Sequence, residues 1–222
     1  MTERADATGW RGRSLAGVVA PVADPQTYRN VLYLFLAFPL GLGYYFLLVF
    51  GLVLGVALAV VVVGLLVLLG VVVGSRFLAS FERSLANRLL GTEIADPDDV
   101  DRDASGVVET AKAYLRAGST WGGLGFVALK FPVGVLSFVL LVSLLGTAIE
   151  LLLLPVYPGG AFNVEVAGWV VARSFETTTE RLLAVPAGAV LGVVAVNVLN
   201  AFADANASIA SSLLGSNADA CE

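Results

Sequence analysis

Long stretches without charge dominate the pattern of the chain. From Asn30 to Ser75 no residue is charged, and these 46 positions are more than twice the roughly 20 residues that one transmembrane helix needs. Apolar residues would lie on every face of such a helix, which excludes a soluble amphipathic helix. Because Gly51 and Gly55 lie near the middle of the stretch, we expect two spans joined by a turn at about residues 52–56.

Two further apolar blocks predict two more spans. One covers residues 122–157 and includes two charged residues, Lys130 and Glu150, whereas the other covers residues 182–203 and includes none. The predicted fold class is therefore an all-α integral membrane protein with amphipathic helices at the membrane interface. Its four transmembrane helices are expected at about residues 31–52, 56–76, 129–154 and 181–203.

Composition agrees with a membrane location. The chain is 58% hydrophobic and 14% charged, whereas soluble domains are about 45–50% apolar and about 25% charged. So few charges exclude an ordinary soluble enzyme, and a net charge of −5 disfavours contact with nucleic acid. The chain has no histidine, and its one cysteine is Cys221, so we expect no metal site and no cofactor.

Basic residues predict the orientation of the chain. Ten of them lie in the N-terminal segment and in the loop over residues 77–128 with its flanks, whereas the segment between the third and fourth spans and its flank contain two. Positive residues stay on the cytoplasmic side. We therefore expect a protein of the plasma membrane, with both termini and the loop in the cytoplasm and residues 155–180 outside the cell. No signal-peptide pattern precedes the first span.

The ratio of arginine to lysine and the low isoelectric point predict the type of organism. Eleven basic residues are arginine and two are lysine, and the isoelectric point is about 4.7. An acidic, lysine-poor surface stays hydrated at high salt, which predicts a haloarchaeal-type protein. The expected organisation is a disordered cytoplasmic tail over residues 1–26, a membrane domain over 27–215 and a short cytoplasmic tail over 216–222.

The membrane domain contains an internal similarity. Residues 27–49 match residues 120–142 at an offset of 93, and residues 84–91 match residues 208–215 at an offset of 124. Each half contains two spans, so both halves begin on the same side of the membrane. The pattern predicts two parallel two-span repeats.

A Phe-Pro-x-Gly motif occurs once in each half. It places Pro39 and Gly41 in the first half, and Pro132 and Gly134 in the second. Proline removes a helical hydrogen bond, so the two motifs could mark paired hinges. Alternatively, an interfacial helix over residues 27–37 ends there and proline begins the span.

Two charged residues of the third span are further candidates. Lys130 and Glu150 are about 30 Å apart along a helix, so each is expected to extend its charged group to its own membrane interface. A role of Glu150 in a proton or ion path is the alternative.

Polar residues form a stripe on the fourth span. Asn197, Asn200 and Asp204 share one helical face, which indicates either a ligand or output-coupling surface or hydrogen bonds between helices. We expect the stripe to contact the first half of the bundle. Arg76 and Asp204 both lie at cytoplasmic span ends, so they are predicted to form an ion pair.

The sequence resembles the putative sensor domain family, a four-span module that often precedes histidine kinases in bacteria and stands alone in haloarchaea. The resemblance covers about residues 27–215. It is most specific in the repeated Phe-Pro-x-Gly motif and in residues 81–83 leading to Leu89-Leu90-Gly91. It implies a membrane-embedded signal-input module. Because the sequence ends seven residues after Gly215 without a kinase domain, output is expected to pass through a separate partner.

The leading hypothesis is a non-enzymatic sensor protein that signals to a separate kinase, regulator or transporter subunit. The alternatives are a small membrane transporter or channel component, and a membrane scaffold. A membrane enzyme is disfavoured, because no cluster of acidic or nucleophilic residues lies at one depth. The lipid bilayer is an expected partner and nucleic acid is not, and the sequence leaves an oligomer open.

The predicted orientation can be tested by cysteine labelling in sealed cells. A membrane-impermeant maleimide is expected to label Gly160→Cys and to leave Ser105→Cys unlabelled, with Cys221 replaced by serine in both. Labelling of Ser105→Cys before the membrane is permeabilised would reverse the topology.

Overall fold

The computed structural model describes residues 15–61, 63–97, 107–156, 161–166, 169–174 and 177–215. Helices account for most of these residues, and a short pair of strands joins the third and fourth spans. The elements in chain order are α1 (Leu15–Ala23), α2 (Pro25–Ala57), a 3₁₀ turn η1 (Ala59–Val61), α3 (Val63–Leu89), α4 (Val107–Arg116), α5 (Gly118–Leu140), a π-helical segment η2 (Leu141–Gly146), α6 (Thr147–Leu153), β1 (Ala161–Val166), β2 (Trp169–Ser174) and α7 (Thr178–Leu214).

In the described part of the chain, four helices are long and apolar enough to cross a membrane, and they confirm the predicted all-α class with four spans; the amphipathic interfacial helices and the repeat stay predictions. The four helices are α2, α3, the continuous helix formed by α5, η2 and α6, and α7. The first turn is displaced from its predicted place: Gly51 and Gly55 lie inside α2, and the turn follows Ala57. Gly55 packs against Leu68 of α3, so glycine here permits close helix packing rather than a turn.

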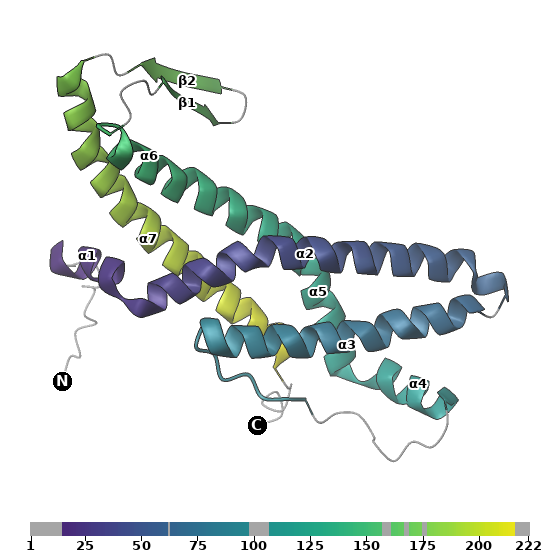
Figure 1. Ribbon diagram of the computed structural model, residues 1–222. Coiled ribbons are helices and arrows are strands. Elements are labelled where there is room, and N and C mark those ends of the chain that lie inside the picture. The colour runs from purple at the N-terminus through teal and green to yellow at the C-terminus, as the bar shows by residue number, and fades with distance from the viewer. Residues whose placement is uncertain are drawn as a thin grey trace, which may run out of the picture.

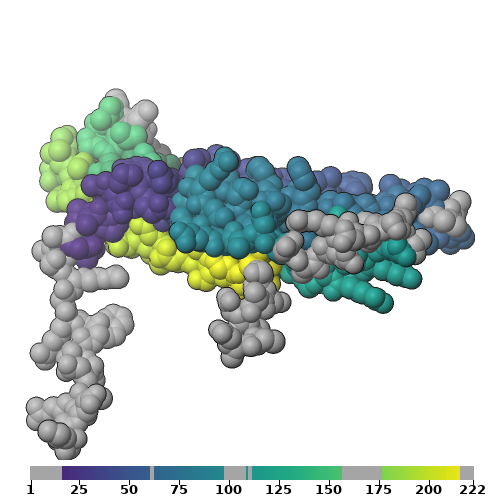
Figure 2. Space-filling view, turned by 90° about the horizontal axis from the view of Figure 1, so that it is seen from below, coloured from purple at the N-terminus to yellow at the C-terminus, as the bar shows by residue number. Residues whose placement is uncertain are grey.

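The helices form two hairpins that share one crossing. Figure 1 shows α2 and α3 as one hairpin, with α5, α6 and α7 forming the second. The two hairpins meet where α2 crosses α5, and from there their turns point in different directions. Figure 2 shows the resulting elongated shape, in which the later part of α2 and the start of α3 form an arm on one side.

Two glycines set the distance between α2 and α5 at the crossing. A Cβ added to Gly41 would lie 2.6 Å from the carbonyl oxygen of Lys130, and a Cβ added to Gly134 would overlap the carbonyl oxygen of Ala37. The two helices therefore touch through their backbones. These contacts correspond to each other at the offset of 93 residues.

Aromatic rings surround the crossing in the same paired manner. Phe38 stacks on Phe138 with ring centroids 4.7 Å apart, and Tyr45 stacks on Phe131 at 4.6 Å. The two pairs correspond at the offset of 93 residues, because Phe38 corresponds to Phe131 and Tyr45 to Phe138. The two Phe-Pro-x-Gly motifs thus pack against each other at the centre of the molecule.

Neither motif proline begins a helix. Pro39 lies inside α2 and Pro132 inside α5, so the interpretation that an interfacial helix ends before Pro39 is wrong. The helix instead begins at Pro25, where the side chain of Asp24 accepts a hydrogen bond from the backbone N–H of Gln26. Proline is favoured at that first position because its missing N–H would be unpaired there in any case.

A short leading helix precedes each half. Residues 15–23 fall in the segment predicted to be a disordered tail, but they form α1, which corresponds to α4 at the offset of 93. The hydroxyl of Tyr28 donates to the carbonyl of Val22, six residues earlier, and the indole N–H of Trp121 donates to that of Leu115, also six residues earlier. The correspondence agrees with the predicted repeat; duplication as its origin stays a prediction.

A β-hairpin that the apolar pattern did not predict lies between the third and fourth spans. Strands β1 and β2 pair antiparallel, from Ala161 opposite Ser174 to Val166 opposite Trp169. Their β-branched residues favour extended backbone, and residues 161–166 alternate apolar with polar positions in part. The hairpin is appended to an otherwise helical fold (Figure 1).

The crossing predicts a selective effect of alanine. Gly41→Ala is expected to lower the free energy of unfolding by about 1–3 kcal/mol, because the added methyl group meets the backbone of α5. Gly43→Ala is the matched control, since a Cβ at Gly43 meets nothing within 4 Å. Thermal or denaturant unfolding in detergent measures both, and equal stability of the two variants would contradict the close contact.

Candidate functional site

A buried ion pair lies next to the helix crossing. The Lys130 Nζ is 2.6 Å from the Glu82 Oε2. The lysine side chain is 2% exposed and the glutamate is fully buried. The pair joins α5 of the second half to α3 of the first half.

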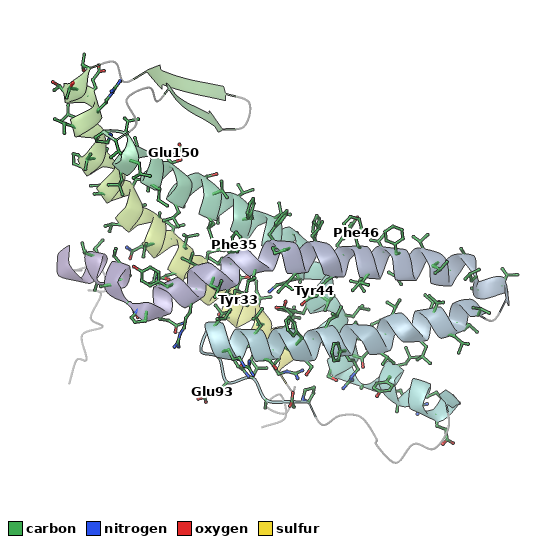
Figure 3. All side chains as sticks on the ribbon, in the orientation of Figure 1. Tyr33, Phe35, Tyr44, Phe46, Glu93 and Glu150 are labelled. Atoms are coloured by element: carbon green, nitrogen blue, oxygen red, sulfur yellow. The ribbon has the colours of Figure 1, made fainter. Side chains whose placement is uncertain are left out.

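Two tyrosines of α2 complete the cluster. The Lys130 ammonium donates to the Tyr33 hydroxyl at 2.9 Å, and the Tyr44 hydroxyl donates to the Glu82 Oε1 at 3.0 Å. The ammonium nitrogen also lies 4.2 Å from the centre of the Tyr33 ring, a cation–π contact. Figure 3 shows both tyrosines near the crossing. We call these four residues the ion-pair cluster.

The sequence positions the cluster through two local patterns. Lys130 directly precedes the second Phe-Pro-x-Gly motif, so the glycine crossing brings its backbone against α2. Glu82 lies on the same side of α3 as three small buried residues, Ser75, Ala79 and Ala86. Small residues let helices approach closely, so Glu82 on that face of α3 is buried between the packed helices.

The expectation for Lys130 is therefore wrong. Its charged group does not reach the membrane interface but pairs inside the bundle, because Glu82 offers an opposite charge at the same depth. Glu150, by contrast, is exposed on α6 near its end at Leu153 (Figure 3). That position agrees with a side chain that extends to the membrane interface.

The hydrogen bonds of the cluster offset the cost of burying its two charges. Removing two charges from water costs several kcal/mol per ion, which their attraction repays only when the remaining hydrogen bonds are also made. Here each carboxylate oxygen has a donor. Among the described residues, no buried side-chain nitrogen or oxygen lacks a hydrogen-bond partner.

A second polar cluster ties α7 to the first half. The Asn200 side chain donates to the Thr27 hydroxyl at 2.8 Å and accepts from Asn30 at 3.0 Å. Gln26 extends the cluster by donating to Asn30 and to the backbone carbonyl of Leu89 at the end of α3. The cluster therefore joins the start of α2 to both second helices of the hairpins.

The other predicted residues of the polar stripe differ in their surroundings. Asn197 donates to the carbonyl of Val18 in α1 at 3.0 Å, so it contacts the leading helix that precedes the first half. Asp204 is exposed. Across the described residues no ion pair joins it to Arg76, whose guanidinium instead donates to Ser119 and Thr120 at the start of α5. The predicted Arg76–Asp204 pair is wrong: Arg76 is directed to the start of α5, whereas the Asp204 side chain is exposed on α7.

The actual partners of Arg76 follow the same internal correspondence. Arg76 corresponds to Asn200 at the offset of 124, and Thr120 corresponds to Thr27 at the offset of 93. Each second helix therefore donates to the threonine that begins the first helix of the other half. The ion pair breaks this correspondence: its counterparts are Asn206 and Ala37.

The ends of the two hairpins meet at Arg83. This residue follows Glu82 directly, and its guanidinium donates to the carbonyl of Leu214, near the end of α7, and to the carboxylate of Asp96. The arginine also lines a polar pocket of about 260 Å³ together with Arg76, Ser80, Asp96, Pro97 and Ser119.

No metal-ligating arrangement accompanies these clusters in the described ranges, where no three histidine, cysteine, aspartate or glutamate residues gather. The sequence of the chain matches the family described as "Putative sensor" over residues 33–214. The chain belongs to this family. The match begins at Tyr33 of the ion-pair cluster and ends at Leu214, the residue that Arg83 contacts.

This family is the one that the sequence resembles. Together with the four span-length helices, it identifies the chain as a sensor-type, multi-pass membrane protein. No curated protein and no solved structure gives a significant match to the chain. Sequence reasoning missed the pairing of Lys130 with Glu82. The signal that could have revealed it is the glutamate on the small-residue face of α3.

The ion pair predicts a non-additive response to mutation. Lys130→Met leaves Glu82 buried and unpaired, which is expected to cost about 3–5 kcal/mol of stability. Adding Glu82→Gln removes the unpaired charge and keeps an acceptor for Tyr44, so the double variant is expected to recover at least half of the loss.

Unfolding in detergent measures both changes as a double-mutant cycle. Glu150→Gln is the control, because this exposed carboxylate is expected to have little effect. Additive losses in the double variant would show that the lysine and the glutamate do not depend on each other.

Proposed function

We propose that this sensor-family protein is a non-enzymatic signal-input module of the plasma membrane that relays to a separate cytoplasmic or membrane partner. The ion-pair cluster is its coupling element, and the ends of α3 and α7, which we call the exit helices, are its output. The observation that carries the proposal is the buried Lys130–Glu82 pair between the two hairpins.

The cluster is suited to coupling because its members come from three helices. Glu82 belongs to α3, Lys130 to α5, and both tyrosines to α2. Any change in the angle between the hairpins must move these groups relative to one another. A buried charge pair has few acceptable arrangements, so it converts a gradual motion into a change between discrete states.

The ion-pair cluster is connected to the ends of α3 and α7 through a single neighbouring residue, Arg83. Glu82 and Arg83 are neighbours in α3, and Arg83 holds the carbonyl of Leu214 at the end of α7. Movement of Glu82 therefore alters the contact between the two exit helices. The basic residues at the end of α3, Arg83 and Arg88, support a cytoplasmic location for these ends, where a kinase, regulator or transporter subunit would bind.

The transporter alternative has less support. A path for ions or protons needs polar groups that are free to exchange partners. In the described part of the chain every buried side-chain nitrogen and oxygen already has a hydrogen-bond partner, and Glu150 lies on the exposed surface of α6 rather than in the bundle.

The coupling can be tested by the distance between spin labels on the exit helices. Ser84 and Ser208 are both exposed and correspond at the offset of 124 residues. In Ser84→Cys/Ser208→Cys, with Cys221 replaced, Lys130→Met/Glu82→Gln is expected to broaden or shift the distance distribution, because the discrete arrangement is lost. Pulsed electron spin resonance in nanodiscs measures it, with Glu150→Gln as the control.

An unchanged distribution in the neutralised variant would refute coupling through the cluster. The relay is tested separately by a photo-crosslinking amino acid at position 84 in the native cell. Crosslinking to a kinase, regulator or transporter subunit, with a yield that changes in Lys130→Met/Glu82→Gln, supports the relay. Absence of such a product, or an unchanged yield, contradicts it.

A further inference from the structure

An apolar groove of about 770 Å³ runs between α2 and α3, away from the ion-pair cluster. Phenylalanine side chains line it from both helices: Phe46 and Phe50 from α2, and Phe77 from α3. Ser75 is the lining residue with a polar side chain, and its hydroxyl is already bonded to the carbonyl of Val72. The groove therefore offers nothing to a polar ligand.

Missing side chains create the hollow. Gly70 and Gly74 lie one turn apart on α3, and a Cβ added to either would meet nothing within 4 Å. At Gly51, on the opposite wall, an added Cβ would meet the side chain of Val71. The space is thus left open on the α3 side, whereas the helices are in contact beside it.

The length of the groove matches one leaflet of a bilayer. Its lining extends along α2 from Phe46 to Ala57, a rise of about 16 Å at 1.5 Å per residue. Half of a hydrocarbon core of about 30 Å is about 15 Å. The groove also ends at the turn between α2 and α3, which is where the leaflet surface on that side would lie.

We propose that this groove binds one hydrocarbon chain of a membrane lipid, from the leaflet that contains the α2–α3 turn. The hydrocarbon chain of the lipid lies along Gly70 and Gly74, and the rings of Phe46, Phe50 and Phe77 contact it from the sides. These rings are between 50% and 76% exposed. The entirely hydrocarbon character of the lining and its one-leaflet length favour a lipid chain over a headgroup or a soluble ligand.

A helix of a second copy is the competing occupant, since paired glycines also favour helix association. Two features favour the lipid. A docking helix would continue along the whole span, whereas the groove covers one leaflet, and the exposed rings of Phe50 and Phe77 lie among its lining residues, where a helix backbone would have to pass them. The inference goes beyond the proposed function and does not depend on any relay.

Photo-crosslinking with a lipid tests the assignment. The full chain is reconstituted into vesicles that contain a phospholipid with a diazirine in its acyl chain, and labelled residues are located by mass spectrometry. Labelling is expected to concentrate on the groove. Gly74→Leu fills the groove and is expected to reduce this labelling at least fivefold. Gly43→Leu, which adds the same side chain at an exposed site outside the groove, is expected to leave it unchanged.

Three outcomes would overturn the proposal. The first is uniform labelling of all lipid-facing residues in the unmodified chain, a result that does not depend on how any variant folds. The second is unchanged groove labelling in a folded Gly74→Leu protein. The third is efficient disulfide formation between two copies of Gly70→Cys in the membrane, which would identify the groove as a dimer interface.

Discussion

Contact between the backbones of α2 and α5 is the constraint on which the rest of the structure depends. Gly41 and Gly134 carry no side chain that could hold the two helices apart. At this distance the residues next to each motif meet the opposite helix. Lys130 reaches Tyr33, and the aromatic rings of both motifs stack across the crossing. The ion-pair cluster therefore exists because the crossing is tight.

Much of this fold could be predicted from the sequence, because lipid imposes simple rules. Uncharged stretches of more than twenty residues can be little else than membrane helices, and Phe-Pro-x-Gly occurs at both sides of the crossing. The bounds were less accurate. Gly51 and Gly55 were expected in a turn because glycine permits turns, yet in this chain they serve helix contact.

The site was harder to predict than the fold, since it depends on which helix faces meet. Lys130 and Glu82 are 48 residues apart in sequence, and no periodicity links them. The stripe of Asn197 and Asn200 was placed on one face correctly, because that follows from helical geometry alone. The contacts of Arg76 with α5 were not, because the sequence does not show which helix this side of α3 faces.

The length of the helices has a mechanical consequence. The 33 residues of α2 rise by about 50 Å, whereas a hydrocarbon core is about 30 Å thick. A helix longer than the bilayer accommodates the mismatch by tilting. Both hairpins diverge from one crossing (Figure 1), so a tilt of one hairpin relative to the other is a change in the angle at that crossing. A bilayer that tilted one hairpin relative to the other would therefore also change the packing around Lys130.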